Sequence, residues 1–577
     1  MKTVRVLGAS LVGTGAELVT VEARFDRTDR ERTEVVLSGL PDPVLREARG
    51  RLECALRENG VRLTNGRLFL NLVPAARRKS GEILDLPLAL GAAAALGHLD
   101  RRALLGTLFL GELGIDGRLH AVPGGLAAAL AARGASVTSV VAPPATAIEA
   151  ACVEDVTAFG AAHLAQVLAH VTEKRRLRAV EPPDDTTPAG ERPETETNER
   201  PSTLDEVRGL GLGKHALAVA AAGGHGLLFV GPPGAGKSML ARRLVRLLPA
   251  PSLSERLEIT SVLSAGGRWP GGLARTRPLR APHHTVSYAG LVGGGPGVHA
   301  GEVTLAHRGV LFLDELPEFR REALEALRQP IEAGSVLISR AGRQTELPAR
   351  FHLVAAMNPC PCGYLGHPRV PCRCPPSYVQ RYRHRVSGPL LDRIDLRIEL
   401  SPPSVEELVP GSDSPPSSGP DETELRERVD RARRRSRARQ AVDNADLEAS
   451  ELDRVAGLDA EAQRLVLRAA KRQTLSARAL QSLRRVARTL ADLEDRHDVA
   501  AKHVAEALAL RAEVRDARPP PHRPPGPLSG PTCAKPSLEA CRNPMDVDRA
   551  LVRTHVRPAT ERRYPLLTLR NQRQVAG

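Results

Sequence analysis

Aromatic residues are scarce in this chain: Phe, Trp and Tyr make up only 2% of its 577 residues, and Trp269 is the sole tryptophan. Such a protein has few rings to stack on unpaired bases, so contacts with nucleic acid are expected to rest on phosphates and loops. No apolar run approaches the length of a membrane span, about 18 residues, and the N-terminus lacks the apolar segment and cleavage site of a secretory signal. We therefore expect a cytoplasmic protein without membrane contacts.

Cysteine is also rare, with eight in the whole chain, too few for the disulfide framework of a secreted protein. What the chain has instead is positive charge, with a formal net charge of +15. Such a balance favours polyanionic partners, nucleic acid first and an anionic membrane second. A hydrophobic content of 42% is typical of a globular protein, and the length predicts several domains.

Shifts in composition divide the chain into six segments. They are an α/β domain at 1–172, a polar Pro-rich linker at 173–203, a nucleotide-binding core at 204–402, a Pro/Ser-rich linker at 403–422, a helical domain at 423–515 and a basic, low-complexity tail at 516–577. The tail is expected to be disordered, and both a dispensable tail and a tether for polyanions stay open. Within the first domain, residues 17–24, 33–38 and 68–73 predict strands, residues 43–59 and 85–99 predict helices, and residues 108–117 predict a hairpin edge.

The stretch from Gly231 to Ser238 matches the phosphate-loop pattern G-x-x-x-x-G-K-[ST] and lies between an apolar strand and a predicted helix. Its glycines let the backbone fold around an anion, so that N–H groups and a helix N-terminus face it. Lys237 is expected to reach the β- and γ-phosphates and the Ser238 hydroxyl to bind Mg²⁺. The expected nucleotide ligands are Gly231, Pro232, Pro233, Gly234, Ala235, Gly236, Lys237, Ser238 and Asp314.

Two carboxylates follow a second apolar strand, at Asp314 and Glu315. In an open α/β sheet, the carboxyl end of such a strand lies beside the phosphate loop. We expect Asp314 to hold Mg²⁺ and Glu315 to act as general base on the attacking water. The alternative is a capped strand end without chemistry.

Three further polar residues complete a predicted site for triphosphate hydrolysis. Asn358 ends a third apolar strand, and its amide can orient water without titrating. Arg393 follows an apolar pair and is expected to reach a γ-phosphate in a neighbouring subunit, while Arg478 in the helical domain is expected to contact the same phosphate. Taken singly, an arginine of this kind is more often a surface residue, and only its position in the whole pattern favours a role at the phosphate.

Phosphate loop, Asp-Glu strand, polar strand end, arginine and helical lid, in this chain order, resemble the AAA+ ATPases. More specific matches resemble the ComM/YifB family of magnesium-chelatase-like ATPases; they are Ala281–Gly295, Gly301–Gly309, Asn358–Gly363, Ser387–Asp395, Ala487–Leu493 and His503–Leu508. The resemblance covers residues 3 to 515. It implies an α/β fold with a parallel sheet, a ring of subunits, a hexamer by preference, and ATP with Mg²⁺ between subunits. The role implied is ATP-driven branch migration and helicase activity on branched or single-stranded DNA during natural transformation.

The first domain resembles the Lon-protease-like fold (ribosomal S5 domain 2-like) of that family. Where Lon-type proteases have a nucleophilic serine and a basic lysine, this chain has Asp85 and Ala127. Neither a carboxylate nor alanine serves those roles in acyl transfer, so protease activity is not expected.

Four of the cysteines cluster as Cys360, Cys362, Cys372 and Cys374. Two close pairs of thiolates predict a closed, structural zinc site, although C-x-C is tighter than the common C-x₂-C spacing. Reduced thiols or a redox pair are the alternatives.

His283 and His284 precede a glycine-rich stretch that resembles the pore-facing insert of this AAA+ branch, and Arg340 with Arg343 lie in a predicted hairpin. We expect these four residues to contact DNA, against a purely structural loop. The other readings of the whole chain are a metal-chelatase-like ATPase subunit and a protein-remodelling AAA+ machine.

Overall fold

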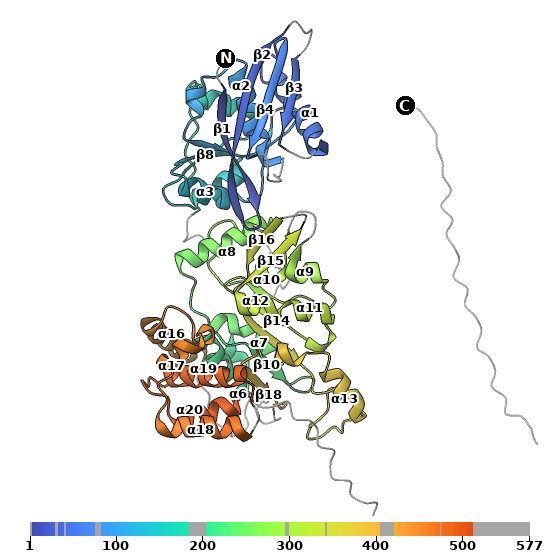
Figure 1. Cartoon of the computed structure of the whole chain (residues 1–577), viewed down its shortest axis with the longest axis vertical. Coiled ribbons are helices and arrows are strands. Elements are labelled where there is room, and N and C mark those ends of the chain that lie inside the picture. The colour runs from blue at the N-terminus through green and yellow to red at the C-terminus, as the bar shows by residue number, and fades with distance from the viewer. Residues whose placement is uncertain are drawn as a thin grey trace, which may run out of the picture. The chain divides into compact units, whose positions relative to one another are not determined.

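The computed structural model of the chain describes residues 3–28, 33–39, 42–74, 82–183, 203–294, 299–340, 343–403, 421–472 and 475–511 (Figure 1). Most of the predicted linkers at 173–203 and 403–422 and the whole predicted tail at 516–577 lie outside the described residues. None of the described helices combines the length and the apolar character needed to cross a lipid bilayer.

The N-terminal domain is built on a mixed sheet, in which the described strands follow the order β3-β4-β2-β1-β5-β8-β9. The strands of the domain are β1 (Val4–Val12), β2 (Gly15–Arg27), β3 (Thr33–Ser38), β4 (Gly66–Val73), β5 (Thr107–Phe109), β6 (Glu112–Leu113), β7 (Leu119–His120), β8 (Ser139–Ala142) and β9 (Thr157–Gly160). Its helices are α1 (Asp42–Glu58), α2 (Asp85–Ala95), α3 (Gly125–Gly134), α4 (Pro144–Ala151) and α5 (Leu164–Val171), with 3-10 turns η1 (Glu82–Leu84) and η2 (Arg101–Leu104).

Buried and more exposed side chains alternate along β2 and β4, so that one face of the sheet is covered by the core of the domain. Helix α2 packs on β1 and β2, and its alanines and leucines are buried almost all round. The hairpin edge predicted at 108–117 is wrong at its start, because β5 lies inside the sheet, paired in parallel with both β1 and β8. The rest of the predicted range does enter a hairpin, in which β6 pairs with β7. Leu108 is fully buried, which is what an interior strand requires.

The core domain holds a sheet whose described strands follow the order β11-β14-β17-β10-β18, all paired in parallel. Its strands are β10 (Leu227–Val230), β11 (Leu279–Arg280), β14 (Val310–Leu313), β17 (His352–Met357) and β18 (Leu396–Glu399), and the small ribbons are β12 (Gly293–Gly294) with β13 (His299–Ala300) and β15 (Ser335–Arg340) with β16 (Arg343–Pro348). Strands β10 and β14 are buried along their whole length, as expected for a parallel sheet covered on both faces. An α/β fold with a parallel sheet in the core is therefore confirmed.

The helices of the core are short and several carry explicit start signals. They are α6 (Gly211–Gly223), α7 (Lys237–Leu247), α8 (Leu253–Ala265), α9 (Tyr288–Val292), α10 (Glu302–Leu305), α11 (Arg321–Ala326), α12 (Arg328–Ala333), α13 (Pro376–Arg383) and α14 (Gly388–Leu391), with 3-10 turns η3 (Leu204–Glu206) and η4 (Leu316–Glu318). Ser252 and Glu255 form a capping box at the start of α8. Helix α12 ends at Gly334, whose left-handed backbone turns the chain directly into β15.

The C-terminal part of the described chain is helical. It comprises α16 (Glu422–Arg439), η5 (Asn444–Asp446), α17 (Ala449–Val455), α18 (Ala460–Arg472), α19 (Ala477–Leu493) and α20 (Ala501–Ala509), drawn in orange to red in Figure 1. The apolar faces of α16 and α19 share one buried cluster with α6 and with strands of the core sheet. These helices are therefore packed against the core rather than tethered to it.

A buried polar network also joins the two parts. His225 Nδ1 lies 2.9 Å from Asp395 Oδ2, and its Nε2 lies 2.8 Å from Thr489 Oγ1. The Ser482 hydroxyl donates to Asp395 Oδ1 at 2.5 Å. Burial acts to raise the pKa of Asp395, but the hydrogen bonds from His225 and Ser482 together with the charges of His225 and Arg511 outweigh it and hold the pKa below its usual value. The network satisfies polar groups that would otherwise be costly to bury between strand and helix.

Candidate nucleotide and metal sites

The phosphate loop joins β10 to α7 at the carboxyl end of the sheet. Strand β10 lies between β17 and β18, so the chain leaves it at the point where connections run to opposite sides, which is where such sheets bind ligands. Gly234 and Gly236 have positive φ angles of 78° and 76°, which other residues rarely adopt. The loop then enters α7 with Lys237 and Ser238 in its first turn.

Lys237 is held among oxygen acceptors. Its Nζ donates to the carbonyls of Gly231 at 2.7 Å and Pro232 at 2.8 Å, and to Asn358 Oδ1 at 3.1 Å. Only 9% of the residue is exposed. Burial lowers the pKa of Lys237, while the charges of Asp314 and Glu315 act in the opposite direction. The structure thus brings Lys237 and Asn358, which are far apart in sequence, into direct contact at one point.

Ser238 meets the carboxylates predicted from the second apolar strand. Its Oγ donates to Asp314 Oδ2 at 2.6 Å, and the other oxygen of Asp314 accepts from the Glu315 backbone N–H at 2.9 Å. A hydroxyl and a carboxylate on neighbouring elements are oxygen ligands of the kind that Mg²⁺ prefers. The donor set therefore fits Mg²⁺.

Glu315 occupies a backbone conformation that is uncommon for its residue type, with φ at 52°. Its carboxylate is exposed, and Oε2 lies 3.3 Å from His284 Nδ1. His284 follows the neighbouring strand β11, and its ring lies over the ring of His283 with centroids 4.1 Å apart. Of the two histidines expected at DNA, His284 thus contacts the predicted general base, whereas His283 is exposed. A non-glycine residue at positive φ beside a catalytic motif is a recurrent mark of functional sites.

The two predicted arginines lie together, but at the other end of the sheet. Arg393 precedes β18, whose Leu396 pairs with Leu227 at the start of β10. The length of β10, roughly 13 Å, therefore separates Arg393 from the phosphate loop of its own chain. Arg393 and Arg478 both form ion pairs with Glu332. Sequence reasoning had no signal for Glu332, since an isolated carboxylate in a helix is ordinary.

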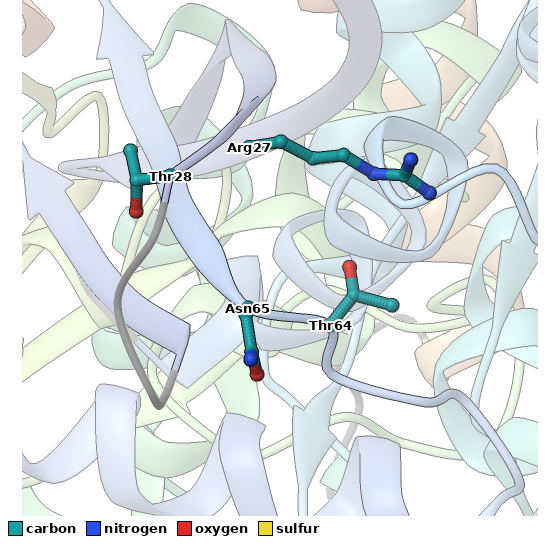
Figure 2. A pocket seen from close by; sticks show the side chains of 4 residues that line it. All are labelled: Arg27, Thr28, Thr64 and Asn65. Atoms are coloured by element: carbon teal, nitrogen blue, oxygen red, sulfur yellow. The ribbon is translucent and has the colours of Figure 1, made fainter.

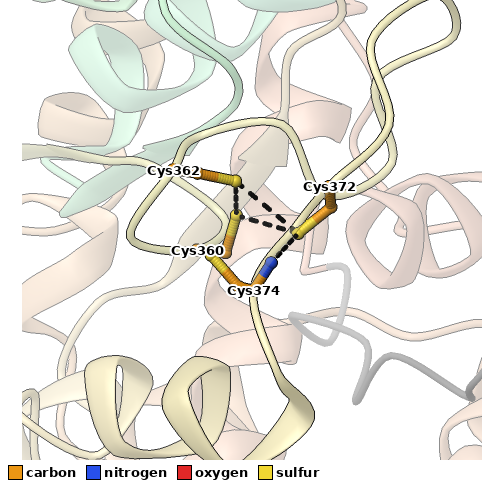
Figure 3. Close-up of side chains that lie close together, drawn as sticks. All are labelled: Cys360, Cys362, Cys372 and Cys374. Atoms are coloured by element: carbon orange, nitrogen blue, oxygen red, sulfur yellow. Dashed lines mark hydrogen bonds between the residues drawn. The ribbon is translucent and has the colours of Figure 1, made fainter. Parts of the chain in front are cut away.

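The four clustered cysteines converge in a loop directly after Asn358 (Figure 3). The sulfur of Cys360 lies 3.4 Å from that of Cys362 and 3.6 Å from that of Cys372, and Cys362 and Cys372 are 3.6 Å apart. The ligand atoms of all four lie within 4.8 Å of one another. Four sulfurs about 2.3 Å from one zinc ion stand about 3.8 Å apart in a tetrahedron. The donor set and spacing therefore fit Zn²⁺.

This loop also touches the phosphate loop. Gly363 has φ at 83°, and a Cβ on it would lie 2.6 Å from Cδ of Pro233. Only glycine therefore fits at this contact. The cysteine cluster and the nucleotide site share a boundary, which the spacing of the cysteines alone did not predict.

The hairpin arginines Arg340 and Arg343 stand opposite each other at the ends of β15 and β16, as the hairpin prediction requires. Their side chains lie outside the described structure, so their predicted contact with DNA stays a prediction. A separate pocket of about 530 Å³ on the N-terminal domain is lined by Arg27, Thr28, Thr64 and Asn65 (Figure 2). It combines no general base with a nucleophile, and we assign no chemistry to it.

Asp85 and Ala127 lie in helices α2 and α3 of the N-terminal domain, and both are buried. Asp85 Oδ2 accepts hydrogen bonds from Arg51 Nε at 3.0 Å and the Leu113 N–H at 3.2 Å. Burial raises the pKa of Asp85 to about 7, although the charge of Arg51 opposes the rise. The carboxyl group at this position is thus bound to an arginine within the domain.

Comparison with known proteins places the chain. The family model for magnesium chelatase subunit ChlI matches residues 203–408, its C-terminal model matches 419–511, and the model "Subunit ChlI of Mg-chelatase" matches 21–146. The "Competence protein ComM" of Haemophilus influenzae is 38% identical over 518 residues, which cover 88% of this chain and 97% of that protein. The "Uncharacterized protein YifB" of Escherichia coli is 38% identical over 512 residues, 87% of this chain and 95% of that protein. The chain belongs to the ComM/YifB family.

A shorter match joins this ComM/YifB family member to a different group. The "DNA replication licensing factor MCM3 homolog 1" of Zea mays is 28% identical over 133 residues, which are 23% of this chain and 15% of that protein. The core of the ComM/YifB chain is a magnesium-chelatase-like AAA+ domain, and ATPase activity is the general activity that this membership supports.

Proposed function

We propose that this protein is an ATP-hydrolysing ring motor that acts on DNA, in branch migration or helicase activity during integration of donor DNA in natural transformation. The observation that carries the proposal is the position of Arg393 and Arg478. They stand at one end of the sheet while the phosphate loop stands at the other. A site split in this way is completed by a neighbouring copy, and a hexamer is the stoichiometry we propose for the ring.

In the proposed site, Ser238 and Asp314 would hold Mg²⁺, which would neutralise charge on the β- and γ-phosphates. Lys237 contacts the same phosphates once its hydrogen bond to Asn358 is broken. Asn358 orients the attacking water, and Glu315 takes its proton. Arg393 and Arg478 of the adjacent subunit stabilise the charge that builds on the γ-phosphate.

DNA is proposed as the substrate of the motor from the charge of the chain together with its similarity to other proteins. The chain carries a net charge of +15 and few aromatic residues, which favours contacts with phosphates over stacking on bases. The relative from Haemophilus is named a competence protein and that from maize a DNA replication licensing factor. We propose that the loop with His283 and His284 and the hairpin with Arg340 and Arg343 grip the DNA backbone, with little base specificity. A structural Zn²⁺ on Cys360, Cys362, Cys372 and Cys374 would fix the loop that borders the phosphate loop.

The test uses purified protein with a labelled three- or four-stranded DNA junction, ATP and Mg²⁺. We expect strand exchange by the wild type and none by Lys237→Ala or Glu315→Gln, with DNA binding retained. Exchange absent from the wild type, or undiminished in both variants, would refute the motor. ATP hydrolysis without any response to DNA would point instead to a chelatase-like or protein-remodelling ATPase.

A further inference from the structure

Glu332 bonds both arginines that the proposed function needs. Its Oε1 lies 2.7 Å from Arg393 Nη2, and the same oxygen pairs with Arg478 Nη2. The three residues come from different places in the chain: Glu332 from α12, Arg393 from the turn before β18, and Arg478 from the first turn of α19. One carboxylate oxygen thus ties the core to the helical domain.

The charge state of this group follows from its partners. Burial acts to raise the pKa of Glu332, but the hydrogen bonds from Arg393 and Arg478 outweigh it and keep the pKa below its ordinary value. Glu332 is therefore ionised at neutral pH. Two guanidinium groups on one oxygen repel each other, and a negative charge between them offsets that repulsion.

The trio is accessible from outside the chain. The side chain of Arg393 is 10% exposed, that of Arg478 is 39% exposed and that of Glu332 is 43% exposed. Arg393 and Glu332 line a pocket of about 690 Å³, which also includes Tyr288 and Arg328. Arg393 donates one further hydrogen bond, to the Pro389 carbonyl at 2.7 Å. Since a guanidinium has five N–H donors, both arginines keep donors for an incoming oxyanion.

We propose that Glu332 is a positioning residue that holds Arg393 and Arg478 together as one unit aimed at the γ-phosphate bound by a neighbouring copy. The inference rests on the proposed function, because it takes the phosphate from an adjacent subunit. Without the carboxylate the two cations separate, and the γ-phosphate then meets one arginine rather than two. The stabilisation that is lost is that of the transition state, so kcat falls while KM for ATP is retained.

The first measurement is steady-state ATP hydrolysis by single variants. We expect Glu332→Ala to lower kcat at least tenfold with KM within twofold of the wild type, and Glu332→Gln, which keeps the hydrogen-bond acceptor, to lower kcat less. The double variant Glu332→Ala/Arg393→Ala should be no slower than Arg393→Ala, because the two residues act as a unit. Glu427→Gln, which removes an exposed carboxylate paired with Arg431 on α16, is the matched control and should keep wild-type kcat. A fully additive double variant contradicts the inference.

The decisive measurement uses rings that contain two different variants. It is needed because Glu332 of one subunit is proposed to act on the ATP bound by the adjacent subunit. A mixed ring of Lys237→Ala and Glu332→Ala subunits contains sites with an intact phosphate loop from one copy and an intact Glu332 from the next. We expect its ATPase rate to exceed that of either variant alone. Lys237→Ala mixed with Glu315→Gln should show no gain, since both defects lie on the phosphate-loop side.

A mixture of Lys237→Ala and Arg393→Ala subunits distinguishes failure of the Glu332 inference from failure of the proposed inter-subunit site. If this mixture recovers activity and the Glu332 mixture does not, Glu332 acts within its own subunit and the inference is wrong. If neither mixture recovers, the arginines do not serve a neighbour and the proposed inter-subunit site itself is wrong.

Discussion

Two domains of this molecule place acidic residues at the junction of a loop and a buried element, and these acids differ in their partners and in their exposure. Asp85 in the N-terminal domain is 3% exposed and is bound to Arg51 and to a backbone N–H. Asp314 and Glu315 in the core follow the carboxyl end of β14, an interior strand of the sheet, beside a serine and a lysine from another element. The comparison teaches that the partners and the access of a carboxylate, rather than its place in a motif, decide what chemistry it can perform.

The largest expected effect tests that contrast directly. Glu315→Gln and Lys237→Ala should each lower the rate of ATP hydrolysis at least 100-fold, a range typical of removing a general base or a phosphate contact. Asp85→Asn should leave the rate within twofold of the wild type. ATP turnover at saturating Mg²⁺ measures all three. An equal loss in Asp85→Asn would show that the N-terminal carboxylate takes part in the cycle.

Asn358→Ala is expected to have the next largest effect, a loss of roughly 10- to 100-fold in kcat, since the amide orients water but exchanges no proton. Asn358 also accepts from Lys237 at 3.1 Å, so affinity for ATP should change much less than kcat. Single-turnover hydrolysis alongside nucleotide binding separates the two. A variant that loses binding rather than turnover would assign Asn358 to the lysine instead of to the water.

Cys372→Ser should remove zinc from the protein and lower its thermal midpoint by several degrees, because a structural site contributes its binding free energy to folding. Metal analysis gives the zinc content, and Cys54→Ser, at an exposed cysteine far along the chain from the cluster, is the matched control. Since Gly363 of the same loop abuts Pro233, ATP turnover should fall with the metal. Unchanged metal content in Cys372→Ser would remove the zinc proposal.

The smallest effect is a pH dependence of stability in the N-terminal domain. The pKa of Asp85 is raised from 3.8 to about 7 by burial, so the unfolded chain releases this proton well before the folded chain does. Stability from this group is therefore full below about pH 4 and lost as pH rises to about 7, by on the order of a few kcal/mol. Thermal midpoints from pH 4 to pH 8 should fall for the wild type relative to Asp85→Asn. A constant difference between the two proteins would contradict the assignment.

Much of the fold followed from local patterns. The strand at residues 33–38 and the long helix α1 appeared where periodicity placed them, and the parallel core agrees with what the family resemblance implied. Strands β8 and β9 were not predicted, because stretches of four residues are too short to show a distinctive period. Strand β1 was not predicted either, although its first residues alternate between buried and more exposed positions. The hairpin edge predicted at 108–117 was wrong only at its start, since the three residues of β5 cannot be told from a hairpin edge until their neighbours in the sheet are known.

The site divides in a similar way. Lys237, Ser238, Asp314 and Asn358 follow strands whose carboxyl ends meet, so their contacts were accessible to reasoning from topology. The pairing of Glu332 with two arginines was not, because it joins three segments through side chains alone. The contact of His284 with Glu315 was missed as well, since it depends on which strand lies next to β14 in the sheet.

The buried network around His225 has a mechanical consequence. Asp395 lies two residues after Arg393, and its partners Ser482 and His225 bind it to α19, the helix that begins beside Arg478. A displacement of one arginine is thus expected to move the other as well, because these buried hydrogen bonds connect the two segments that carry the arginines. In the ring that we propose, loss of the phosphate contact of either arginine would therefore be felt by both the core and the helical domain of the subunit that carries them.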